Sequence, residues 1–168
     1  MIRTYNEDEA FSKLAESCSA TEHCRADVAE KIVRWGLPYD TVKRLLNRLE
    51  EGRYIDEERY CRAFIHDKFY LAKWGKKKIA QALHLKKISP FTCNHLLNEI
   101  DEVEYLTALG QLLISKQKSV RAASDYERNG KLVRFALSRG YELKDIRKCM
   151  PDIDYEEVEE QETEEAQP

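Results

Sequence analysis

An apolar pattern recurs along this chain at intervals of about 50 residues, and this repeat is the feature that most constrains the fold. One set of apolar positions, Val28, Ala29 and Ile32, recurs as Ile79, Ala80 and Leu83 and again as Leu132, Val133 and Ala136. A second set, Val42, Leu45, Leu46 and Leu49, recurs as Cys93, Leu96, Leu97 and Ile100 and again as Ile146, Cys149, Met150 and Ile153. The turns between the two sets also correspond, at Gly36-Leu37, Lys87-Ile88 and Gly140-Tyr141. Because stripes and turns align together, they indicate a structural repeat rather than a chance alignment.

The spacing within each repeat is helical, with apolar residues three, four and seven positions apart on one face. Capping residues and breakers bound the expected helices. The predicted helices run from Asn6 or Asp8 to about Cys18, from Arg25 to Trp35, from Pro38 to Glu51, from Asp56 to about Lys73, from Asp101 to about Gln117, from Ser124 or Asp125 to Gly140, and from Leu143 to Met150. A short basic helix is expected from Gly75 onward.

These helices predict an all-α fold of three tandem three-helix repeats. Because three short helices cannot build a large core alone, neighbouring repeats are expected to share apolar surfaces in an elongated, curved body. The predicted boundaries place the repeats at residues 1–52, 53–100 and 101–153, followed by an acidic tail at 154–168 that is expected to be disordered.

The charge of the chain is divided unevenly between its body and its C-terminal end. The net charge is -3, but the segment from Pro151 onward holds nine acidic residues and no lysine or arginine. Residues 1–150 therefore have all 28 basic residues and the other 22 acidic ones, a net charge of +6. A basic body suits contact with phosphates. The tail either aids solubility or competes with DNA for the basic surface or touches a partner.

Five scattered cysteines without a Cys-x-x-Cys pair indicate free thiols, mostly buried, in a reducing compartment. Cys18, His23 and Cys24 lack a fourth ligand and a standard zinc spacing, so no metal and no cofactor is expected. No run of residues approaches the length of a membrane span, and Met1–Asp8 lacks a signal-peptide core. The cytoplasm is the expected compartment.

No catalytic constellation stands out, and an enzyme is not expected. The four histidines are isolated in sequence, and no phosphate-binding glycine loop or His-Glu-x-x-His motif occurs. Asp56-Glu57-Glu58 resembles a carboxylate cluster, but a helix start explains these acids through capping and the helix dipole.

Two adjoining stretches of the middle repeat are similar to a known family. Gly52-x-Tyr54-Ile55-Asp56-Glu57-x-Arg59-Tyr60-x-x-Ala63-Phe64-Ile65 is followed by Gly75-x-x-x-Ile79-x-x-x-Leu83 and by Lys87-Ile88. This pattern resembles the middle of RecX, the regulatory protein of the RecA recombinase. The resemblance implies tandem three-helix repeats and a protein that binds the RecA nucleoprotein filament. It also implies restraint of strand exchange, ATP hydrolysis and coprotease action in DNA repair, recombination and the SOS response.

The middle repeat also contains the residues expected to contact the filament or DNA. Lysines bind phosphates as point charges and read no base sequence, so non-specific backbone contact is expected. The candidate residues are Arg59, Arg62, Lys68, Lys76, Lys77, Lys78, Lys86 and Lys87. Tyr54 and Trp74 are possible interface aromatics, although packing against a neighbouring helix is favoured for Trp74 and a joint between repeats for Tyr54. The chain is expected to be monomeric.

Three other interpretations stay open at this point. One treats the lysines as an ordinary solvated helix face. The chain could be a sequence-neutral DNA-binding helical protein that acts without RecA, because paired short helices mimic a helix-turn-helix. It could also be a purely structural helical adaptor.

Overall fold

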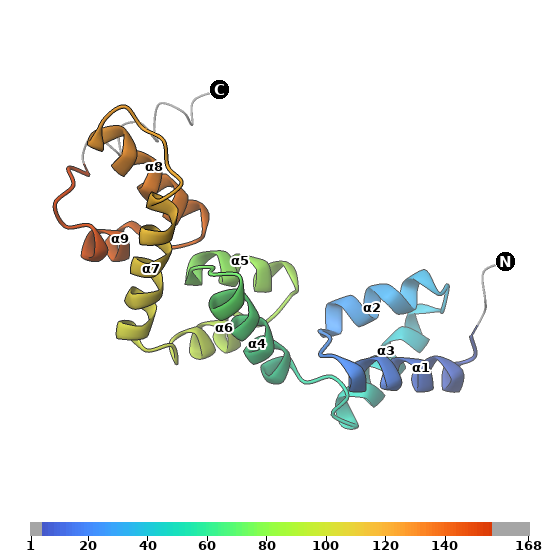
Figure 1. Ribbon diagram of the computed structural model, residues 1–168. Helices are drawn as coiled ribbons and strands as arrows, with labels where there is room; N and C mark the ends of the chain where they lie inside the picture. The colour runs from blue at the N-terminus through green and yellow to red at the C-terminus, as the bar shows by residue number, and fades with distance from the viewer. Residues whose placement is uncertain (1–4, 156–168) are drawn as a thin grey trace. The chain divides into compact units, whose positions relative to one another are not determined.

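The structure is a computed structural model that describes residues 5–155, which form helices and connecting turns without a β-strand. The predicted all-α class and the tandem arrangement of three-helix groups are thus confirmed. The helices are α1 (Glu7–Ala20), α2 (Arg25–Arg34), α3 (Tyr39–Glu51), α4 (Glu57–His66), a π-helical segment η1 (Asp67–Leu71), α5 (Lys76–Leu85), α6 (Pro90–Leu97), α7 (Glu102–Gln117), α8 (Asp125–Ser138) and α9 (Leu143–Cys149) (Figure 1). None of the helices within residues 5–155 has the length and apolarity needed to cross a membrane.

The residues group into two compact units. Among the described residues, unit 1 contains residues 5–68 and 80–98, and unit 2 contains residues 69–79 and 99–155. The repeat boundaries at 52, 100 and 153 stay a prediction. Most of the acidic tail, from residue 156 onward, lies outside the described residues.

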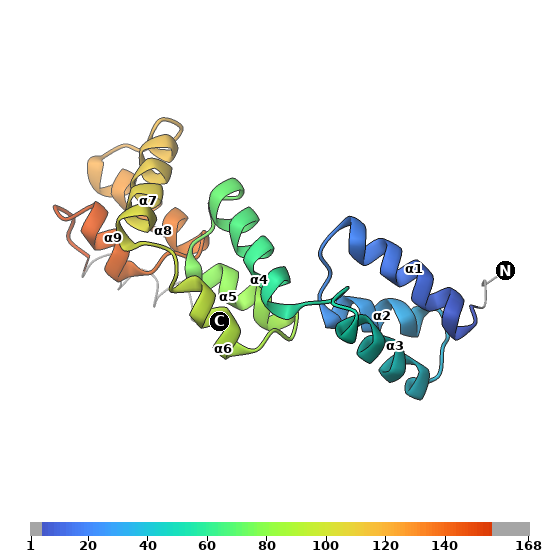
Figure 2. The same ribbon diagram turned by 90° about the horizontal axis from the view of Figure 1, so that it is seen from below.

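The core of unit 1 begins where α1, α2 and α3 lie side by side, as both views show (Figure 1, Figure 2). The apolar stripes place one buried face of each helix toward this core. Its buried residues are Ala10, Leu14, Ala15, Cys18, Val28, Ile32, Val42, Leu45, Leu46, Leu49 and Ile55. In the same unit α4 packs against α6.

Side chains cap the first helix of each group and also α8. Asn6 and Glu9 form a reciprocal capping box at α1. Asp56, Asp101 and Ser124 accept hydrogen bonds from backbone amides at the starts of α4, α7 and α8. These caps satisfy amide groups that have no partner inside the helix, which explains why the predicted starts agree with the structure.

The helix predicted from Asp56 to about Lys73 is shorter than expected. Its regular part, α4, ends at His66 and continues as the π-helical segment η1. Lys73 then adopts a positive φ of 60°, which no right-handed helix accommodates. The chain therefore leaves the helix before Trp74 and Gly75.

The core of unit 2 lies between α7, α8 and α9. Both α8 and α9 contact α7, and Leu109, Val133 and Ile146 are fully buried among them. Phe69 stacks on Tyr105, with ring centroids 5.7 Å apart and an interplanar angle of 25°. Phe69 of the π-helical segment thereby joins the core of unit 2.

Two glycines of unit 2 allow backbones to approach closely. Gly75 donates a 2.7 Å hydrogen bond from its amide to the Arg139 carbonyl. A Cβ atom at Gly140 would lie 2.5 Å from the Lys78 backbone nitrogen, and Gly140 has a φ of +91°. A side chain at Gly140 is therefore opposed by both backbone strain and overlap.

We expect Gly140→Ala to lower the free energy of unfolding by about 3 kcal/mol or more, because the strain of a positive φ adds to this overlap. The matched control is Gly36→Ala, which also has a positive φ, of +76°, but finds nothing within 4 Å of its Cβ. The control should lose only about 1 kcal/mol. Urea denaturation followed by circular dichroism measures both, and equal losses would contradict the close approach.

A second prediction concerns the cap of α4. The Arg59 amide, which donates to the Asp56 carboxylate at 2.9 Å, lowers the pKa of that carboxyl below its usual value. Asp56→Ala should cost about 1 kcal/mol of stability at neutral pH. Because the folded-state pKa is lowered, the charge-dependent part is present above about pH 4 and is lost as pH falls through the folded value.

The stability difference between Asp56→Ala and the natural protein should therefore shrink in acid. Asp56→Asn is the control, because asparagine is an equally good cap that does not titrate in this range. An Asp56→Ala penalty that stays constant from neutral pH to pH 3 would contradict an ionic contribution.

Candidate functional site

The basic residues predicted to contact a filament or DNA differ widely in exposure. Arg62, Lys77 and Lys87 are exposed. The others, Arg59, Lys68, Lys76, Lys78 and Lys86, are half-buried. Their local contacts decide which of them can reach a partner.

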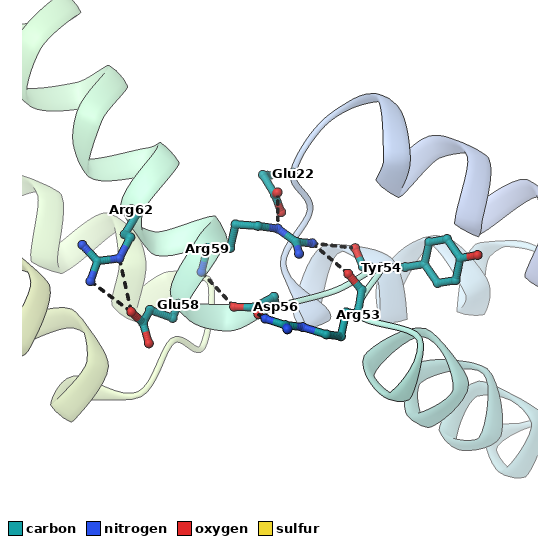
Figure 3. A network of polar contacts seen from close by, with 7 residues as sticks. All are labelled: Glu22, Arg53, Tyr54, Asp56, Glu58, Arg59 and Arg62. Atoms are coloured by element: carbon teal, nitrogen blue, oxygen red, sulfur yellow. Dashed lines mark hydrogen bonds and ion pairs between the residues drawn. The ribbon is translucent and has the colours of Figure 1, made fainter.

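Arg59 is committed to contacts within unit 1. Its guanidinium forms an ion pair with Glu22 and donates to the backbone carbonyls of Arg53 at 3.0 Å and Tyr54 at 3.4 Å (Figure 3). Its backbone amide donates a hydrogen bond to the Asp56 carboxylate, which caps α4. Arg59 thus ties the loop before α2 to the turn before α4, which is a structural task.

Two further cations of unit 1 also have carboxylate partners. Lys86 donates to both oxygens of Asp27, at 2.9 Å and 3.0 Å. Arg62 pairs with Glu58 one helical turn earlier, at 3.0 Å, although both side chains are largely exposed (Figure 3). Exposed pairs of this kind contribute little stability, so Arg62 can exchange Glu58 for a phosphate at small cost.

The start of α5 is closed to anions by its contacts within unit 2. The Lys76 amide donates to the Tyr105 hydroxyl at 2.9 Å, and the Lys77 amide donates to the Gly140 carbonyl at 3.1 Å. With the Gly75 bond to Arg139, these contacts use the amides that a helix N-terminus would otherwise offer to a phosphate. Burial raises the pKa of Tyr105, which keeps its hydroxyl protonated.

Two of the three consecutive lysines lie over aromatic rings. The Lys76 ammonium is 4.7 Å from the centroid of the Tyr105 ring, and the Lys78 ammonium is 4.5 Å from that of Trp74. Such cation–π contacts hold the ammonium groups near unit 2. In the described part of the chain, the ammonium groups of Lys77 and Lys87 have no such aromatic or carboxylate partner, which leaves them available to a polyanion.

The predicted interface aromatics are both half-buried. Tyr54 packs edge-on against Phe11 of α1, with ring centroids 5.8 Å apart. Trp74 lies beneath Lys78. Phe91, which the sequence analysis did not single out, is far more open, with 81% of its surface exposed. The sequence could have predicted this exposure, because the buried stripe Cys93, Leu96 and Leu97 places Phe91 on the opposite face of α6.

The described cysteines and histidines form neither a disulfide nor a metal-ligand cluster. All five cysteines are free thiols, four of them buried, as predicted. Burial raises the pKa of the Cys61 thiol to about 12, so this thiol stays protonated. His23 contacts the hydroxyls of Thr21 and Ser17 at 3.0 Å and 3.3 Å. Within residues 5–155, no three His, Cys, Asp or Glu side chains gather as metal ligands.

Comparison with known proteins agrees with this fold. A family profile described as RecX, second three-helix domain, matches residues 56–96. The regulatory protein RecX of Clostridium perfringens (strain SM101 / Type A) is 32% identical over 148 residues, which cover 83% of this chain and 68% of that protein. The regulatory protein RecX of Herminiimonas arsenicoxydans is 26% identical over 136 residues, 79% of this chain and 84% of that protein.

Solved structures give the same result for the fold. The crystal structure of RecX from Lactobacillus salivarius matches with a TM-score of 0.78 and 15% sequence identity, covering 87% of this chain and 95% of that chain. Together with the 32% identity to the Clostridium perfringens protein, this match confirms the resemblance seen in the sequence. The chain belongs to the RecX family of regulatory proteins.

Proposed function

We propose that this protein binds the RecA nucleoprotein filament and restrains its recombinase, ATPase and coprotease activities. The observation that carries the proposal is membership in a family of regulatory proteins, shown by the 32% identity to a RecX protein over most of the chain. The protein would act as a cytoplasmic monomer in DNA repair, in recombination and in the SOS response.

The exposed lysines supply the physical basis of the proposed contact. Lys77 on α5 and Lys87 in the turn after α5 are point charges that suit DNA phosphates or acidic groups of a protein, without selecting a base sequence. Lys76 and Lys78 contribute less, because they already lie over aromatic rings. We propose that Lys77 and Lys87 each contact the filament or DNA independently of the other.

DNA-dependent ATP hydrolysis by RecA from the same source, with this protein titrated in, tests the proposal. Inhibition well below one protein per RecA subunit indicates capping or breakage of filaments, whereas inhibition near equal amounts indicates coating. Unchanged hydrolysis, together with DNA binding in the absence of RecA, would favour a sequence-neutral DNA-binding protein that acts alone.

We expect Lys77→Glu and Lys87→Glu, made singly, each to weaken inhibition and to lower the salt dependence of filament binding. If each lysine neutralises one phosphate, the slope of log affinity against log salt should fall by about 0.7–0.9 per residue, before any added repulsion. Affinity measured at several salt concentrations gives this slope.

Lys43→Glu is the matched control, since Lys43 is also exposed but lies on α3. It should change the slope far less than the two test variants. An equal change in all three variants would mean that net charge, rather than these two positions, governs the contact.

A further inference from the structure

We propose that unit 1 has a base-stacking site for single-stranded nucleic acid on the exposed face formed by the end of α5 and by α6. The site is centred on Phe91 and His95. The proposal goes beyond filament binding, because it assigns a ligand that this surface would bind without a recombinase.

Two aromatic rings stand parallel on this face. Phe91 and His95 are one helical turn apart on α6, with ring centroids 6.2 Å apart and an interplanar angle of only 4°. Both side chains are exposed, and Phe91 has 81% of its surface open. Bases of a single strand stack on such rings irrespective of sequence, because every base has a π-face.

An apolar groove is lined by α5 and α6 of unit 1, including the sequence neighbours Pro90 and Asn94 of the two rings. It has a volume of about 480 Å³, and its lining includes Ala80, His84, Leu85, Ile88, Pro90 and Asn94. This volume lies within the range of small-ligand pockets, about 300–1,000 Å³. The Leu85 side chain is 80% exposed at this groove. The Asn94 amide adds a donor and an acceptor that suit the edge of a base.

The charge of the surrounding sequence favours a polyanion. The part of unit 1 that forms this face, residues 80–98, holds no acidic residue, whereas it holds Lys86 and Lys87. Lys87 is exposed in the turn between α5 and α6 and can contact a phosphate beside the stacked bases. An acidic peptide would match the charge alone, but parallel rings beside an amide suit bases better.

A carboxylate at the start of α6 is already engaged. Glu57 accepts hydrogen bonds from the Ser89 amide at 3.1 Å and from the Thr92 hydroxyl at 3.0 Å, at the start of α6. Glu57 therefore occupies this helix start, and a phosphate is expected at Lys87 rather than there.

Fluorescence anisotropy with the full chain tests the site directly, without RecA. The probe is a dye-labelled oligothymidylate of about 12 nucleotides. Phe91→Ala should weaken its binding at least about fivefold, whereas Phe91→Tyr should retain it. The matched control is Tyr39→Ala, because Tyr39 on α3 is equally exposed, at 81%. Tyr39→Ala should change affinity by less than about twofold, and thermal unfolding verifies that each variant is folded.

An abasic oligonucleotide of the same length separates stacking from charge. It keeps the phosphates but has no bases, so Phe91→Ala should leave its binding unchanged. Equal losses for both oligonucleotides, or no loss for oligothymidylate, would overturn the proposal. A Phe91→Ala variant that loses filament binding but keeps oligonucleotide binding would make this face a protein contact and would also overturn it. These outcomes do not depend on whether the protein inhibits RecA.

Discussion

The packing of each three-helix group depends on the residue that follows its second helix. Gly36, Lys87 and Gly140 occupy equivalent positions in the sequence, and all adopt positive φ, of 76°, 58° and 91°. Each donates its amide to the carbonyl three residues earlier at 2.9 Å. This left-handed residue turns the chain so that the third helix can pack back on the group. The turn sits at a lysine in the middle group, where glycine would relieve strain but would remove an exposed charge.

In unit 2, Gly140 also contacts the start of α5, where its carbonyl accepts a hydrogen bond from the Lys77 amide. Because Gly140 and Gly75 lack side chains, their backbones come close enough for two hydrogen bonds between the start of α5 and the turn after α8. Because the start of α5 is held in this way, the three consecutive lysines have different surroundings. Lys76 and Lys78 lie over aromatic rings, while Lys77 is exposed.

The helices were predictable because their determinants are local. Caps such as Asn6 and Asp56, and stripes three and four residues apart, act within one or two helical turns. The roles of the basic residues were less predictable, because their partners are distant in sequence. Arg59 and Glu22 are 37 residues apart, and Lys86 and Asp27 are 59 residues apart. A sequence pattern shows the charge of Arg59 but not that a carboxylate and two carbonyls already bind it.

The central claim is that the protein recognises the assembled filament rather than one of its components. The most direct measurement compares its affinity for RecA assembled on single-stranded DNA, for RecA alone and for the same DNA alone, at one salt concentration. We predict that the filament binds at least about tenfold more tightly than either component, a difference of about 1.4 kcal/mol in binding free energy. Equal affinity for bare DNA and for the filament would contradict the claim.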